Sequence, residues 1–154
     1  MNWYVRRHDG SVLYSKATRN RSTKEVEELA RNHLSQGAIY GMYDYVGLST
    51  DIMVHFETFI NDLDRRGIAV ELFLSPYNPV YYEAIETNEY YKNFLEVELY
   101  LKALAGNQNL SLMGSYDPRV YGCEQRDVFD EHHTRESCLE KIFDSHDLNS
   151  NTNN

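Results

Sequence analysis

The residues in this chain whose types and spacing most clearly suit catalysis are Asp130 and His133, which stand three positions apart. An aspartate at this spacing can accept the imidazole Nδ1–H and so hold the ring in a single tautomer. The other ring nitrogen, Nε2, can then take a proton from a hydroxyl nucleophile, as in a serine hydrolase triad. Such spacing often arises by chance, but its place after the last predicted strand and before the final helix favours a site. The pair therefore predicts an orienting acid and a general base.

Two other interpretations of the same segment stay open. In the first, Cys123, His132, His133 and Cys138 hold a metal ion. Zinc accepts these ligand types, but their spacing matches no closed structural pattern, so we expect no metal and no other cofactor. In the second, the aspartate only caps the loop and the histidine only packs. The two cysteines could also form one disulfide or remain free thiols, because spacing alone does not establish the geometry.

Two strands are expected to position this pair. Residues 69–74 are a short, mostly apolar run, typical of a strand buried on both faces of a parallel sheet. Residues 110–113 form a second short strand that ends at a glycine. Sites in open α/β sheets gather at the carboxyl ends of the strands. We therefore expect the side chains that follow the two strands to contact a substrate: Ser75, Tyr77, Asn78 and Tyr116.

The remaining elements are predicted from helical periodicity and from turn residues. Asp9-Gly10 is a favoured turn pair between two β-prone runs, and Ser22 with Glu25 makes a capping box. The predicted elements are a hairpin at 3–14 and helices at 22–37, 49–67 and 90–105, with a last helix capped by Thr134. This order predicts a three-layer, flavodoxin-like α/β fold with parallel strands. Because two strands are few for a parallel sheet, we expect a sheet that lacks its N-terminal strands.

The chain is expected to be one domain with a short tail. Residues 1–144 form the domain, in which 1–21 are the hairpin and a basic connection and 22–144 are the helix–strand–helix–strand–helix core. Residues 145–154 are rich in Asn, Asp and Ser and have little to bury, so we expect a disordered tail there.

The net charge of −9 disfavours nucleic acid as a partner, because its phosphates would be repelled. No apolar run is long enough to span a membrane, and the first ten residues lack the apolar stretch of a secretory signal. The early basic residues could meet an anionic partner or simply face solvent: Arg6, Arg7, Lys16, Arg19, Arg21 and Lys24. We therefore expect neither nucleic acid nor a membrane span, and the compartment is not determined by these features.

Residues 114–123 and 127–139 resemble the final block of SGNH/GDSL-type serine hydrolases. Within that family, these residues most resemble uncharacterised SGNH-like proteins found near bacterial surface-polysaccharide genes. In that family a strand, an Asp-x-x-His-Pro loop and a helix supply the acid and base of the triad, which the resemblance assigns to Asp130 and His133. Residues 69–74 and the Ser-Pro-Tyr after them are similar to the penultimate strand of the family. The resemblance covers residues 69–143 and, more faintly, 22–67.

The chain also departs from the family pattern. Thr134 stands where the family has a proline after the histidine. No Gly-Asp-Ser block supplies a nucleophile, and no Gly-x-Asn-Asp block supplies donors for an oxyanion hole. The resemblance therefore implies the back half of the fold, with its acid and base but without its serine.

The chemistry that the resemblance implies is serine-type ester hydrolysis or O-acyl transfer on acylated cell-surface carbohydrate. It also implies a periplasmic or extracytoplasmic setting, which a disulfide between Cys123 and Cys138 would suit. Whether this chain itself is an enzyme stays open. The alternative is a non-catalytic interaction module, or a degenerate fragment of the fold, that associates through its sheet edge with a partner or as a homo-oligomer.

Overall fold

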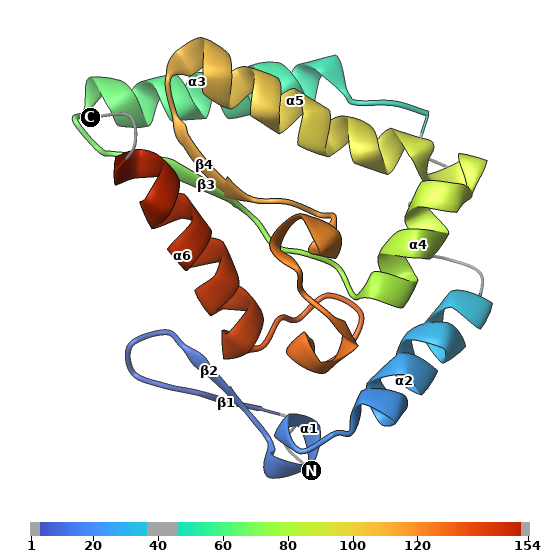
Figure 1. The fold of residues 1–154 in the computed structure, drawn as a ribbon. Helices are drawn as coiled ribbons and strands as arrows, with labels where there is room; N and C mark the ends of the chain where they lie inside the picture. The colour runs from blue at the N-terminus through green and yellow to red at the C-terminus, as the bar shows by residue number, and fades with distance from the viewer. Residues whose placement is uncertain (1–3, 37–45, 152–154) are drawn as a thin grey trace.

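The computed structural model describes residues 4–36 and 46–151, whose arrangement Figure 1 shows. The elements follow the predicted order of a hairpin and then alternating helices and strands, so the α/β class is confirmed. Along the chain they are β1 (Tyr4–Arg6), β2 (Val12–Tyr14), α1 (Lys16–Arg19), α2 (Thr23–Ser35), α3 (Thr50–Arg65), β3 (Glu71–Leu74), α4 (Pro79–Thr87), η2 (Glu89–Tyr91), α5 (Lys92–Gln108), β4 (Ser111–Gly114), η3 (Pro118–Tyr121), η4 (Gln125–Asp127) and α6 (Glu136–Asn151).

Strands β3 and β4 pair in parallel, in a register that runs from Glu71 opposite Ser111 to Leu74 opposite Gly114. On one face, the ring of Phe73 stacks on Phe143 of α6 at a centroid distance of 6.3 Å. Because strand side chains alternate between faces, Leu74 points to the opposite face. Helix α5 also packs against β4, and Figure 1 draws it and α6 on different sides of the strands. Helices therefore pack on both faces at β4, whereas Phe73 of β3 remains 42% exposed.

Within the described part of the chain, β3 and β4 form a two-stranded sheet, and β1 pairs only with β2. Each strand of the parallel pair therefore has one edge without a strand partner among these residues. Helix α2 packs against α4 and η4 instead of against the sheet. The predicted capping box forms at its start, where Ser22 accepts from the Glu25 N–H and the Glu25 carboxylate accepts from the Ser22 N–H.

The exit from β4 is held by a buried carboxylate on α5. Glu98 is 7% exposed, accepts the Ser115 hydroxyl at 2.6 Å and accepts the backbone N–H of Tyr116 at 3.1 Å. Lys102 lies 2.7 Å from the same carboxylate and supplies the opposite charge. A buried charge is tolerated when it is paired and hydrogen-bonded in this way. The contact fixes the loop that leads from the sheet toward Asp130.

Two helices differ from the prediction. Helix α5 continues through Gly106 to Gln108, because Asn109 adopts a left-handed φ of 53° and ends the helix there. Helix α6 begins at Glu136, while Thr134 forms an antiparallel bridge with Val128 instead of capping the helix.

The prediction of a disordered tail from residue 145 is wrong as far as residue 151, because α6 continues to Asn151. Its backbone hydrogen bonds are internal to the helix, so this polar stretch needs no core to complete them. The Ser145 hydroxyl donates to the Lys141 carbonyl at 2.8 Å within the same helix. Residues 152–154 of the predicted tail and residue 3 of the predicted hairpin lie outside the described residues.

No helix within residues 4–36 and 46–151 combines the length and the apolar character needed to cross a membrane.

Gly114→Ala is expected to lower the free energy of unfolding by about 3 kcal/mol. Gly114 has a φ of +84°, and a Cβ there would overlap the Leu74 carbonyl group on the neighbouring strand. The matched control is Gly122→Ala, at a φ of +62° with open space around it, for which we expect about 1 kcal/mol. Urea unfolding of both variants measures the difference. Equal losses would mean that the strands are not in the close contact described here.

Candidate active site

The predicted acid and base lie on a short loop between η4 and α6. The loop is closed at its base by two backbone hydrogen bonds, from the Phe129 N–H to the His133 carbonyl and from the Arg135 N–H to the Asp127 carbonyl, both 2.8 Å long. Asp127 is 3% exposed and accepts the Ser137 hydroxyl and the Lys141 ammonium, each at 2.6 Å. The base of the loop is therefore fixed to the first turns of α6.

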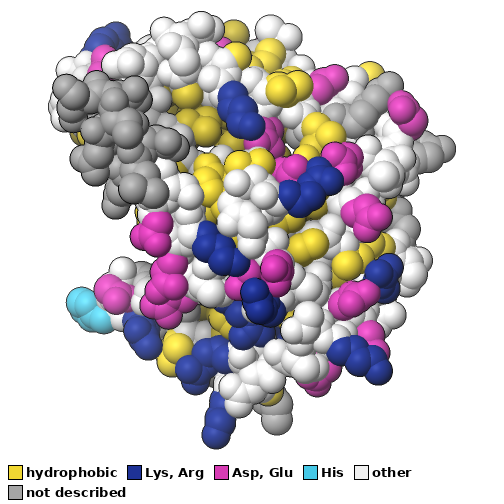
Figure 2. Space-filling view, viewed as in Figure 1, with side chains coloured by type: hydrophobic (Ala, Val, Ile, Leu, Met, Phe, Trp, Pro, Cys, Tyr) yellow, Lys and Arg dark blue, Asp and Glu magenta, His cyan; other side chains and the backbone are white. Residues whose placement is uncertain are grey.

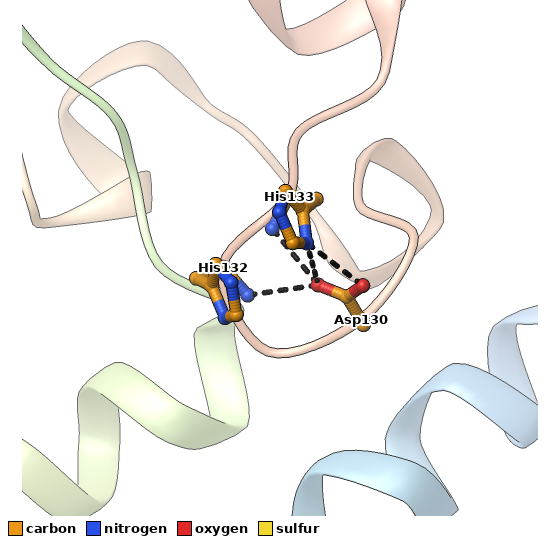
Figure 3. Close-up of side chains that lie close together, drawn as sticks. All are labelled: Asp130, His132 and His133. Atoms are coloured by element: carbon orange, nitrogen blue, oxygen red, sulfur yellow. Dashed lines mark hydrogen bonds and ion pairs between the residues drawn. The ribbon is translucent and has the colours of Figure 1, made fainter. Parts of the chain in front are cut away.

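Asp130 and His133 face each other across this loop (Figure 3). Both carboxylate oxygens of Asp130 lie 2.9 Å from Nδ1 of His133. One of them also accepts the backbone N–H groups of His132 at 3.1 Å and His133 at 3.0 Å. Because an ionised carboxylate can only accept, the His133 Nδ1 carries the shared proton. In the neutral ring, Nε2 is then the basic nitrogen, as a general base requires.

The electrostatics of the pair agree with this geometry. The hydrogen bond that His133 donates to the Asp130 carboxylate raises the pKa of His133, against a smaller opposing effect of burial. Burial acts to raise the pKa of Asp130, but the hydrogen bonds from the His133 ring and from the His132 and His133 N–H groups outweigh it, so that this pKa is lowered. Burial and the charge of His133 lower the pKa of His132. The pKa values of the two neighbouring imidazoles therefore shift in opposite directions, that of His133 upward and that of His132 downward.

Asn78 holds the loop against the exit of β3. Its backbone N–H donates to the Glu131 carbonyl at 3.0 Å, and its side-chain amide donates to the Asp130 carbonyl at 3.2 Å. Its side-chain oxygen accepts the Val80 N–H at 2.9 Å and caps α4. Asn78 is 0% exposed. In this structure the side chain is therefore buried and its hydrogen-bonding groups hold the Asp130 loop, and its contact with substrate stays a prediction.

The other residues predicted to bind substrate follow the carboxyl ends of β3 and β4. Tyr77 and Tyr116 are joined by a backbone hydrogen bond of 3.1 Å, and their rings lie 5.5 Å apart. Both rings also contact Phe94 of α5, and burial raises the pKa of each phenol. They form part of a packed aromatic cluster. Ser75 is partly exposed directly after β3.

Tyr14 is a neighbour of the base that the sequence did not indicate. It stands at the end of β2, and its ring lies 5.4 Å from the ring of His133 and 5.1 Å from Phe129. Burial, followed by the charge of Asp130, raises the pKa of its phenol. The β-prone run predicted the strand, but no local signal predicts where a hairpin docks.

Arg135 holds the segment that follows the hairpin against the Asp130–His133 loop. Its guanidinium donates to the carbonyls of Arg19 at 2.7 Å, Arg21 at 3.2 Å and Val128 at 2.9 Å. Arg21 in turn donates to the Phe129 carbonyl at 3.2 Å. These contacts tie the basic connection to the loop. Figure 2 shows several Lys and Arg side chains at the end of the molecule that contains the hairpin and α1, with Asp and Glu side chains beside them.

Glu131 ties the other side of the loop to α2, through a contact of 2.7 Å between its carboxylate and Nδ1 of His33. The two residues line a shallow hollow of about 250 Å³ together with Leu29, Asn32 and Gln36. A larger apolar hollow of about 370 Å³ lies between α3 and α5, lined by residues such as Ile52, Phe56 and Leu101. The hollow beside Glu131 adjoins the loop.

Cys123 and Cys138 are joined in a disulfide with an S–S distance of 2.07 Å. It links the end of η3 to α6 and packs with Met113 and Ile142. The four-residue metal interpretation is therefore wrong, because the two sulfurs are bonded to each other and offer no thiolate.

Across residues 4–36 and 46–151, no hydroxyl group hydrogen-bonds to the ring of His133; its side-chain partner is Asp130. No protein-family model, no curated protein and no solved structure matches this chain.

Asp130→Asn is expected to lower the pKa of His133 from its raised position to the ordinary range near 6.5 or below, because burial remains after the carboxylate charge is lost. Proton NMR titration of the His133 ring measures this, with His55 on the exposed side of α3 as the internal reference. A raised folded pKa means that the pair stabilises the fold fully below the unfolded value near 6.5 and loses that contribution as the pH rises through the folded pKa. An unchanged titration in the variant would contradict the pairing.

Asn78→Ala is expected to lower the free energy of unfolding by about 2 kcal/mol, since it leaves the Asp130 carbonyl and the Val80 N–H without their partners. Asn32→Ala, at an exposed position on α2, is the matched control and should change stability by less than about 0.5 kcal/mol. Chemical denaturation measures both. A loss no larger than that of the control would show that Asn78 does not hold the loop.

Proposed function

We propose that this chain carries the acid and base of a serine-type ester hydrolase or O-acyltransferase site, with Asp130 as the acid and His133 as the base. The observation that carries the proposal is the pair of 2.9 Å contacts between the Asp130 carboxylate and Nδ1 of His133, on a loop that follows a parallel strand. The resemblance of this segment to the last block of SGNH/GDSL-type hydrolases supports the same assignment. The fold proposed with it is the three-layer, flavodoxin-like SGNH type, with a sheet that lacks its N-terminal strands.

In this mechanism Nε2 of His133 takes the proton of a hydroxyl nucleophile as that oxygen attacks the ester carbonyl. Asp130 stabilises the imidazolium that forms, which agrees with the direction in which it moves the pKa of His133. The imidazolium then returns the proton to the leaving alcohol. No described hydroxyl bonds to the His133 ring, and residues 1–3, 37–45 and 152–154 contain no serine. The serine and the oxyanion donors are therefore proposed to come from another chain.

The proposed substrate is an acylated carbohydrate, as the resemblance implies. Tyr14 supports this choice, because its partly exposed ring lies beside His133 and amphipathic aromatic rings stack well on sugars. The proposed setting is periplasmic or extracytoplasmic, and the disulfide between Cys123 and Cys138 suits such a compartment.

A second candidate function is a non-catalytic module that associates through its sheet edge. The observation that favours it is the two-stranded parallel sheet, in which each described strand has one edge without a strand partner. Sedimentation velocity over a range of concentrations tests it. A concentration-dependent dimer would support the module, and a monomer at every concentration would count against it.

The proposal predicts that the chain hydrolyses p-nitrophenyl acetate at a rate that rises as His133 loses its proton, because the neutral imidazole can attack an activated ester even without a serine. His133→Ala is expected to lower the rate at least about tenfold, and Asp130→Asn by a smaller factor. His55→Ala removes an exposed histidine of α3 and should leave the rate unchanged. Equal rates in the wild type and in His133→Ala would contradict the proposal.

Fluorophosphonate labelling of the same proteins, mapped by mass spectrometry, locates the nucleophile. We expect no labelled serine in the chain by itself. A labelled serine that disappears in His133→Ala would place the nucleophile within this chain. Labelling that persists in that variant would mean that His133 is not the base.

A further inference from the structure

We propose that Asp130, His132 and His133 bind one divalent transition-metal ion of the Zn²⁺ type. The potential ligand atoms of these three partly buried side chains all lie within 4.8 Å of one another. The rings of His132 and His133 have a centroid distance of 4.0 Å, and Figure 3 shows both beside the carboxylate of Asp130. The three side chains come from four consecutive residues of one loop, so a single backbone conformation sets all of them.

The donor set selects the class of ion. Two imidazoles and one carboxylate are typical ligands of Zn²⁺ and of neighbouring transition metals, whereas Ca²⁺ and Mg²⁺ need a shell of oxygen ligands. Three protein ligands with one open position is the usual arrangement of an exchangeable zinc site. Ligands at ~2.1 Å from a tetrahedral ion stand about 3.4 Å apart. The three donors lie within 4.8 Å of one another, so binding an ion requires side-chain rotations that draw them closer.

The surroundings of the loop favour a cation and fix its backbone. Glu131 lies between Asp130 and His132 in the chain, and its negative charge acts on both imidazoles. Asn78 holds the Asp130 and Glu131 carbonyls, and two backbone hydrogen bonds close the base of the loop. An ion therefore needs to reorder only side chains, which limits the entropy lost on binding.

Metal binding and base catalysis exclude each other at this site. An ion bound by Asp130 and by a ring nitrogen of His133 replaces their hydrogen bond or occupies the nitrogen that takes the proton. If the proposed function holds, on which this regulatory consequence rests, Zn²⁺ is an inhibitor that competes with the proton at His133. The binding site itself depends only on the three side chains.

The test is calorimetric titration of Zn²⁺ into the untagged 154-residue chain after chelator treatment, together with the visible absorption of bound Co²⁺. We expect one ion per chain with a Kd below about 10 µM, and a loss of at least tenfold in affinity in His132→Ala. His55→Ala is the matched control, because it removes an exposed histidine near Asp51 on α3. Binding weaker than about 100 µM, or equal binding by His132→Ala, would overturn the site.

His132→Ala also separates this inference from the proposed function, since it leaves Asp130 and His133 in place. Metal binding that disappears in this variant while ester hydrolysis stays independent of His133 would keep the metal site and refute the proposed function. Ester hydrolysis that depends on His133 in a chain that binds no Zn²⁺ would refute the metal site and keep the function.

Discussion

The candidate site depends on one buried amide, that of Asn78. It joins the exit of β3 to a loop 52 residues further along the chain by donating to the Asp130 carbonyl, while its backbone N–H donates to the Glu131 carbonyl. Buried carbonyls of an irregular loop must find partners, and Asn78 supplies them where the parallel strands end. The carboxylate of Asp130 is thereby set beside the ring of His133 instead of being left to a solvent-exposed turn.

Three further contacts hold the same loop from different directions. Arg135 joins it to the basic connection after the hairpin, Glu131 joins it to α2 through His33, and Asp127 joins its base to α6. The disulfide between Cys123 and Cys138 fixes the segment that leads into the loop against the same helix. Polar contacts therefore hold the loop at residues 129–133 from several sides. Such support is typical of a functional site whose side chains must keep fixed positions, because a loop that only connects two elements needs few such contacts.

Local sequence patterns predicted the elements well and the contacts between them poorly. The apolar run at residues 69–74 and the turn at Asp9-Gly10 predicted β3 and the hairpin, because period and turn chemistry are local properties. The spacing of Asp130 and His133 and their place in the chain predicted that they pair, and the structure has this contact; their roles as acid and base stay a prediction. The burial of Asn78 and the docking of Tyr14 on His133 could not be predicted, since each depends on segments more than 50 residues away. The extension of α6 past residue 145 was missed because a helix satisfies its own backbone without a core.

Asp130 holds the His133 ring with its proton on Nδ1, which leaves Nε2 as the basic nitrogen of the neutral ring. The most direct measurement is a long-range proton–nitrogen NMR correlation of the histidine rings, recorded above the pKa of His133. The structure predicts a His133 ring protonated on Nδ1, with an unprotonated Nε2. A ring protonated on Nε2, or a rapid mixture of both tautomers, would show that the carboxylate does not orient the imidazole and would contradict the account.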